Sequence, residues 1–432
     1  MSVIDQIRHF RPNLHQAAIL LLASPILIHS TTLYNYIPMY AYNLNRYASL
    51  IVLAMLGILA LFNQRKIMIP TPRLMIVALI CLGIAASELV NHGNTLPGEA
   101  LYLIICLLGW LILSGIKKEH GSEQDLMLFA YVLAASALLY SVNAMATILP
   151  HCLFDQDCLY YNTAPLGFEN RRIYNEMQAL MIPALAYLAL RASNNRIVVL
   201  LVGILSVQLG HLYITGGRAA MLGSFGALLA MTYLERHHWR KLSIILAPAL
   251  LISLAMYLGL KYLDQQPITD LNIRTSSSGR WELWQIAWQG GLNSPWLGNG
   301  PGSFALLGLS VGSPHNFWMT VWHDLGILFA LLMLALTGVA LHRVYLTKNS
   351  LLTALGLGLL SSYLFGGHFT SLSVLASLIL LSQLARPNQT KMLSWVFSVG
   401  LLLSITIFAW NYQPATENFQ LKPRLWLQLP SQ

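Results

Sequence analysis

The sequence predicts an all-α protein that crosses a membrane about 12–13 times, as a single integral membrane domain over residues 1–432. Hydrophobic residues make up 56% of the 432 residues and charged residues only 9%, whereas soluble domains carry about 25% charged residues. The mean hydropathy is +0.59. No pattern of short alternating strands appears, so helices are the only way for this backbone to span a bilayer. The composition excludes ordinary soluble enzymes, nucleic-acid binders and disordered proteins.

The apolar runs follow one another along the whole chain, separated by clusters of Arg, Lys, Asn and Pro. A helix needs about 20 apolar residues to cross the hydrocarbon core. The first run follows Arg8 and Arg11 but has no small-residue cleavage site, so we interpret it as a retained helix and not as a signal peptide. Thirteen spans are expected, centred near Leu22, Met55, Leu79, Leu107, Ala134, Pro183, Leu205, Leu229, Ile252, Leu331, Leu357, Leu378 and Leu401.

The net charge of +9 indicates how the chain is oriented in the membrane and is not evidence for an acidic ligand. If the N-terminus is cytoplasmic and the spans alternate, 16 of the 25 basic residues fall in cytoplasmic loops. This is the bias that the positive-inside rule describes. No nucleic-acid partner is therefore expected. An odd number of spans places the C-terminal tail, from Asn411 to Gln432, on the outer side.

Two of the four cysteines, Cys152 and Cys158, lie six residues apart in one predicted outer loop. In an oxidising compartment such a pair can close a small disulfide ring. The alternatives are two free thiols or a metal site, and the latter is weak because two cysteines supply only two ligands.

The longest hydrophilic segment is a large outer loop over residues 263–316. It is expected to carry short helices, and the spacing of Trp281, Trp284 and Trp288 places three indoles on one helical face. Tryptophan favours the membrane interface, so this segment predicts an amphipathic helix in contact with membrane lipids. A platform on which sugar rings stack is the alternative.

Arginines are unexpectedly frequent on the predicted outer side. Guanidinium groups match phosphate oxygens geometrically, and Arg218 follows a Thr-Gly-Gly turn that opens a helix, where backbone N–H groups favour anions. Pairing with nearby acids or with lipid headgroups is the alternative for each one. For the group as a whole, an anionic ligand and such pairing explain the pattern equally well; the arginines concerned are Arg171, Arg172, Arg218, Arg274 and Arg280.

A polar block, Pro314-His315-Asn316-Phe317, joins the long loop to a helix that is expected to continue through His323, Asp324 and Gly326. An imidazole has an ordinary pKa of about 6.5 and can take a proton from a hydroxyl group. A helix cap or an interface histidine is the alternative. The histidines are too scattered to predict a metal site, and neither a GxxxxGK[ST] nor a GxSxG motif occurs.

Three blocks, taken in order, resemble the signatures of the O-antigen ligase/polymerase superfamily. The resemblance covers most of residues 174–384. A further segment, from Phe168 to Gln178, is similar to one found in ligases, including enzymes that glycosylate pilins. The three blocks are Thr215-Gly216-Gly217-Arg218, Arg280-Trp281-x-x-Trp284 with Pro295-Trp296-Leu297-Gly298-x-Gly300-x-Gly302-x-Phe304, and His315-Asn316-x7-Asp324-Leu325-Gly326.

The resemblance implies a metal-independent, inverting glycosyltransferase of the membrane-embedded GT-C type, without a cofactor. Such an enzyme moves a glycan from undecaprenyl diphosphate to an acceptor at the periplasmic face of the bacterial inner membrane. His315 would then be the general base or orient the acceptor, supported by Asn316 and Asp324. The donor diphosphate would be held by Arg218, Arg280 and, in preference to Arg171, Arg172.

The sequence departs from the family pattern at two places. Asp324 stands where the family usually has Glu, and Gly216-Gly217 replaces a more usual Ser before the arginine. The acceptor stays open between lipid A-core, which gives lipopolysaccharide, and Ser or Thr of a type IV pilin or another exported protein. A ligase is favoured over a polymerase. A lipid or solute transporter is the alternative from another class, but ionisable residues cluster at the membrane faces and no repeated halves are detected.

Overall fold

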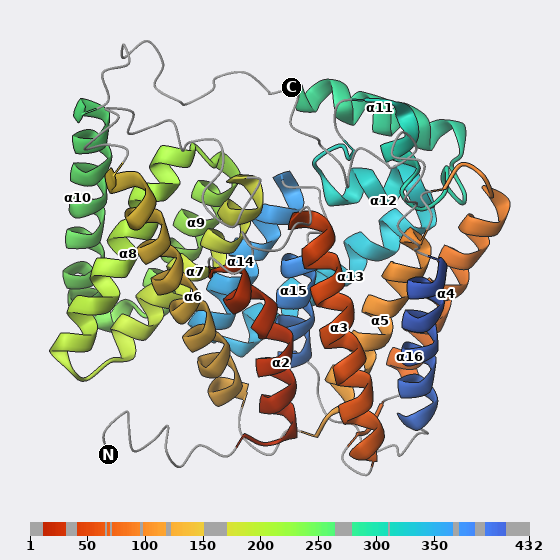
Figure 1. The fold of residues 1–432 in the computed structure, drawn as a ribbon, viewed down its shortest axis with the longest axis horizontal. Helices are drawn as coiled ribbons and strands as arrows, with labels where there is room; N and C mark the ends of the chain where they lie inside the picture. Colours follow the sequence, from red (N-terminus) through yellow and green to blue (C-terminus); the bar gives the residue numbers. More distant parts are fainter. Residues whose placement is uncertain are drawn as a thin grey trace.

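The computed structural model describes residues 12–31, 41–64, 67–69, 71–95, 98–117, 122–150, 171–263, 279–309, 312–365, 371–384 and 394–411. Within these residues the regular structure is helical apart from one isolated antiparallel bridge between Ile67 and Ile116. The helices stand side by side as a bundle, with α11 and α12 at one end (Figure 1). We refer to this as the α11 end.

Each of the thirteen predicted spans coincides with a helix, which confirms the all-α membrane fold. The helices are α2 (Leu14–His29), α3 (Ala41–Phe62), α4 (Thr71–Val90), α5 (Glu99–Gly115), α6 (Ser122–Pro150), α7 (Arg171–Arg191), α8 (Asn195–Thr215), α9 (Arg218–Leu234), α10 (Trp239–Leu263), α13 (Ile327–Thr347), α14 (Ser350–Phe365), α15 (Ser371–Gln383) and α16 (Ser394–Asn411). Short helices lie between them: η5 (Arg236–His238), α11 (Arg280–Asn293), η6 (Ser303–Leu307) and α12 (Phe317–Leu325).

Five helical segments in the described part of the chain are long and apolar enough to cross a membrane, and seven others are apolar but shorter. The five are Thr71–Val90, Glu123–Ala146, Asn195–Thr215, Arg236–Tyr262 and Ile327–Thr347. In α13 only 11% of the apolar spanning stretch is buried within the protein, so most of the surface of this helix is available to contact lipid.

Polar contacts join the helix ends that the alternating topology places on the same side. At the end opposite α11, Arg191 Nη2 lies 2.7 Å from Glu235 Oε1, and Ser350 Oγ donates to the same oxygen at 2.6 Å. At the α11 end, Arg46 Nη2 donates to Glu99 Oε2 at 2.6 Å. For α3, α5, α7, α9 and α14 these contacts agree with the alternating direction that the sequence predicts.

Helix α7 is the centre of the bundle. Every residue from position 174 to position 190 is buried, and the helix packs against α6, α8, α9 and α14. Its polar first turns, which include Asn175, Glu176 and Gln178, are therefore enclosed by protein at the α11 end and do not face lipid.

The long loop carries short helices, as predicted. In α11, Trp281 and Trp288 are 59% and 51% exposed, whereas Trp284 is turned inward and donates from Nε1 to the carbonyl oxygen of Pro314 at 2.9 Å. The three indoles thus share a helix but not one environment. A hydrogen bond joins α11 to α12, since Trp322 Nε1 donates to the carbonyl oxygen of Trp288 at 3.1 Å.

The prediction that one helix continues from Phe317 through Gly326 is wrong. Helix α12 ends at Leu325, and α13 begins at Ile327 after a break at Gly326. Gly326 has φ 83°, and a Cβ there would lie 2.5 Å from the carbonyl oxygen of Trp296. Only glycine fits this backbone and this close approach, so the chain turns here and α12 remains a separate nine-residue helix.

Candidate functional site at the end of α14

The last residues of α14 are the meeting point of two predicted site segments. Asn316 Nδ2 donates to the carbonyl oxygen of Leu364 at 3.1 Å, and the ring of Phe317 lies 5.3 Å from that of Tyr363. The guanidinium carbon of Arg280 lies 5.9 Å from the ring centroid of Phe365. The histidine block and Arg280, 35 positions apart in the sequence, therefore share one neighbour.

His315 is held in an unusual backbone conformation at this junction. It is buried, with 3% of its surface exposed, and its φ of 55° lies in the left-handed region. Its N–H donates to Ser313 Oγ at 3.3 Å, and Asn316 caps α12 by accepting from the N–H of Met319 at 3.0 Å. Such strain in a non-glycine residue is typical of functional sites.

Arg218 reaches the same end of the molecule from another helix. Helices α9 and α14 run antiparallel and pack closely where Gly223 meets Ser361. With a rise of about 1.5 Å per residue, Arg218 lies about 7.5 Å beyond this contact and Phe365 about 6 Å beyond it, in the same direction. Arg218 is exposed at the first position of α9. It is thus level with the end of α14.

The turn before Arg218 is fixed by α7. Thr215 Oγ1 donates to Asn175 Oδ1 at 2.8 Å, and Gly216 ends α8 with φ 62°. A Cβ on Gly217 would lie 2.2 Å from Asn175 Nδ2. The structure thereby explains the departure from the family pattern at this position, because Asn175 occupies the space that a serine side chain would need.

Replacing Gly217 with alanine is expected to lower activity about tenfold to a hundredfold, because the shifted turn displaces Arg218 and an error of about 1 Å has that effect. Gly226→Ala on the same helix is the control, since nothing lies within 4 Å of its Cβ position. Initial rates of both variants at equal protein level would be measured against the unmodified chain. Equal rates for Gly217→Ala would mean that this turn does not set the position of Arg218.

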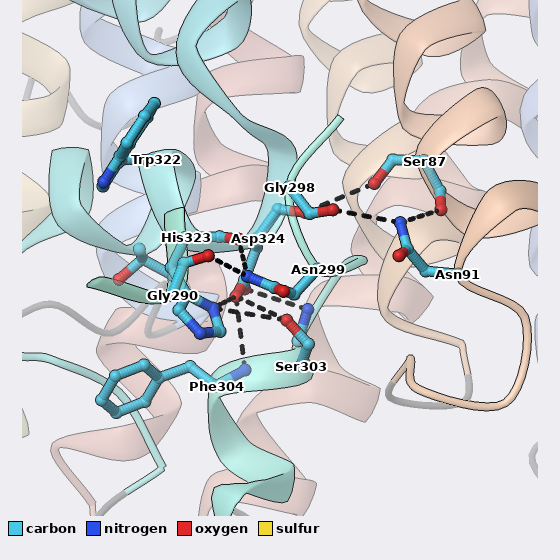
Figure 2. Close-up of polar contacts among 12 residues, drawn as sticks. Ser87, Asn91, Gly290, Gly298, Asn299, Ser303, Phe304, Trp322, His323 and Asp324 are labelled. Atoms are coloured by element: carbon cyan, nitrogen blue, oxygen red, sulfur yellow. Dashed lines mark hydrogen bonds and ion pairs between the residues drawn. The ribbon is translucent and has the colours of Figure 1, made fainter. Parts of the chain in front are cut away.

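Asp324 forms the centre of a second cluster (Figure 2), two residues before the break at Gly326. Its Oδ1 lies 2.8 Å from His323 Nδ1 and accepts from Ser303 Oγ at 3.1 Å and from the N–H of Phe304 at 3.3 Å. Its Oδ2 accepts from the N–H of Gly302 at 3.0 Å. Because a carboxylate only accepts, His323 Nδ1 carries the proton in this pair. Asp324 thus holds η6 against the end of α12 by these hydrogen bonds, and we call this arrangement the Asp324 clamp.

The glycine-rich segment before η6 serves the same clamp. A Cβ on Gly298 would lie 2.3 Å from the backbone carbon of Asp324, and one on Gly300 would lie 2.4 Å from Thr95 Cγ2. Ser87 Oγ donates to the carbonyl oxygen of Leu297 at 2.7 Å. Gly298 lets the loop pack closely against the end of α12, and Gly300 lets it pack against the residues that follow α4. This is a structural reason for glycine at both positions.

The comparison with known families is decisive for the central part of the chain. Residues 201–335 match the sequence model of a family described as O-antigen ligase. This match covers about a third of the chain and supports the O-antigen ligase superfamily. Together with the apolar helices it supports a multi-pass membrane enzyme of the glycan ligase/polymerase type, a class that in general acts on a lipid-linked glycan and an acceptor. No curated protein matches the chain.

The matched segment contains Arg218, Arg280, His315 and Asp324, whereas α7 and α14 lie outside the matched residues. The side chain of Arg172 lies outside the described residues, as do Cys152 and Cys158, so the predicted disulfide stays a prediction. Of the cysteines that the structure describes, Cys81 and Cys106 are free. No group of three or more metal-ligating side chains occurs within the described ranges.

Sequence reasoning named Gln178 only as part of the segment similar to ligases, and it missed the hydrogen bonds that support this end of the bundle from inside. Tyr174 donates from its hydroxyl to Gln208 Oε1 at 2.9 Å, and Gln178 Nε2 donates to the carbonyl oxygen of Gln208 at 2.9 Å. Gln208 Nε2 in turn donates to Ser141 Oγ at 2.9 Å. Polar residues within otherwise apolar runs were the available signal, since they are rarely tolerated in a membrane without a function or a partner.

Proposed function

We propose that the protein is a glycan ligase that transfers an oligosaccharide from undecaprenyl diphosphate to an acceptor hydroxyl group at the periplasmic face of the inner membrane. The observation that carries the proposal is the common neighbour of the site segments: Asn316 and Arg280 both contact the end of α14, and Arg218 lies at its level. Arginines for a diphosphate and a histidine for a hydroxyl group are the groups that this reaction needs.

The proposed reaction is a single inverting displacement. The acceptor oxygen forms a bond to the anomeric carbon of the donor sugar, and the bond from that carbon to the diphosphate oxygen breaks with its electron pair. The acceptor proton passes to the imidazole of His315. Negative charge grows on the leaving diphosphate, so Arg218, Arg280 and Arg172 stabilise the transition state more than the bound donor. The mechanism uses no metal and no cofactor, in a fold of the GT-C type.

Lipid A-core and Ser or Thr of an exported protein such as a type IV pilin are the two acceptor classes we propose. The polar first turns of α7 support a ligase over a polymerase, since the segment with Asn175 and Gln178 is similar to that of ligases. A strain that lacks the chromosomal copy, complemented with the unmodified chain, distinguishes the acceptors on parallel gels. A restored lipopolysaccharide ladder identifies a lipid acceptor, and a pilin mass shift identifies a protein acceptor. No change in either product would contradict a ligase.

Replacing Arg280 with alanine is expected to lower kcat/KM for the lipid-linked donor about a hundredfold or more, as for other groups that stabilise a developing oxyanion. Transfer by purified protein in nanodiscs, with varied donor, would measure this. Arg240→Ala is the control, because Arg240 is an exposed arginine near the opposite end of the bundle, close to Trp239. Similar losses in both variants would show that the effect is not local to the α14 end.

A further inference from the structure

Glu176 is an acid in the interior of the membrane-spanning bundle that no step of the proposed reaction uses. It lies on α7, the helix whose residues are buried from position 174 to position 190, and only 6% of its surface is exposed. Burying a carboxylate in a membrane protein is costly unless cations or hydrogen-bond donors compensate for the lost water. The groups near this carboxylate therefore indicate its role.

The packing of α7 against α14 fixes the direction of Glu176. The two helices touch at Gly358, where an added Cβ would lie 2.2 Å from the carbonyl oxygen of Ala179. Glu176 lies three residues before Ala179, one turn nearer the α11 end and on the same face of α7. There it lies close to the half-buried Tyr363, whose hydroxyl oxygen lies 2.5 Å from Ser377 Oγ on α15.

Glu176 lies at the same end of the bundle as the segments that carry Arg218 and Arg280. Its neighbour Asn175 holds the turn that leads into Arg218. On α14, Phe365, which Arg280 contacts, lies in the same last turn as Tyr363. Arg172 lies four residues before Glu176 in the sequence of α7.

A cluster of arginines needs a counter-charge before its anionic ligand arrives, since like charges repel one another most strongly where water is scarce. One guanidinium has five N–H donors and can serve a carboxylate and a phosphate at the same time. We infer that Glu176 is a positioning residue, whose carboxylate orients the arginines so that their remaining donors point to the donor diphosphate. This inference rests on the proposed function and adds a residue outside the matched family segment.

The test is a steady-state comparison of Glu176→Gln with the unmodified chain, in nanodiscs, with an undecaprenyl diphosphate-linked oligosaccharide and an acceptor varied separately. Loss of one charge-assisted contact corresponds to about a tenfold to hundredfold change in affinity. We therefore expect the KM for the donor to rise by that factor, while kcat and the KM for the acceptor change by less than about threefold. Glu176→Asp, which keeps the charge, is expected to recover part of the loss.

Glu235→Gln is the matched control. Glu235 is also a largely buried carboxylate paired with an arginine, but at the opposite end of the bundle, and its variant is expected to keep the donor KM of the unmodified chain. A fall in kcat with an unchanged donor KM would overturn the inference, because Glu176 would then take part in the chemical step. Unchanged constants in Glu176→Gln would overturn it as well.

A binding measurement covers the case in which Glu176→Gln does not fold. Undecaprenyl diphosphate, the released product, is expected to raise the melting temperature of Glu176→Asp less than that of the unmodified chain at equal concentration. An equal rise would overturn the inference. If the unmodified chain transfers no glycan, the proposed function fails; if it transfers but Glu176→Gln behaves normally, only the role of Glu176 fails.

Discussion

Replacing His315 with asparagine is expected to reduce glycan transfer at least about a hundredfold, the contribution typical of a general base, without loss of folded protein. Asparagine is chosen because it tolerates the left-handed backbone that His315 adopts at φ 55°. An alanine there would add backbone strain to the loss of the imidazole. Transfer rates of purified protein, together with size-exclusion profiles, would measure both effects.

The control for this substitution is His342→Asn, which changes an exposed histidine on α13. Transfer by this variant is expected to equal that of the unmodified chain. If His315→Asn kept more than about a tenth of the activity, another group would have to accept the proton, since removal of a positioned base costs more than that. His315 would then be a structural residue of the α12 cap.

Replacing Asp324 with alanine is expected to destabilise the folded protein by about 3 kcal/mol or more. The carboxylate accepts from two backbone N–H groups and one hydroxyl group and pairs with His323, and alanine leaves these buried donors without an acceptor. The melting temperature in detergent, followed by the fraction of monodisperse protein after heating, would measure the loss. Transfer is expected to fall with the folded fraction.

Glu282→Ala removes an exposed acid from α11 and is the control for this experiment. Its melting temperature is expected to match that of the unmodified chain. A normal melting temperature for Asp324→Ala combined with lost transfer would contradict the clamp, because Asp324 would then act at the reacting groups and not through the fold of α12 and η6.

The positions of the chemical groups were partly predictable from the sequence. Arg218, Arg280 and His315 stand out because they lie in polar segments between apolar runs and in motifs of recognisable order. The role of Asp324 was predictable only in outline, since its four partners lie 1 to 22 positions away in the chain. Glu176 was not predicted as a site residue, because its significance depends on α14, almost 190 positions later in the sequence.

The sequence by itself determined the class of the protein and the location of its helices, because a bilayer imposes one local requirement on every span: about 20 apolar residues with their backbone groups paired within the helix. Only the tertiary structure decided that α12 ends at Gly326, that Asn175 excludes a side chain at position 217, and that the histidine and arginine segments meet at α14. These features depend on contacts of about 2 to 4 Å between distant segments, and hydrophobic periodicity carries no information about which helices become neighbours.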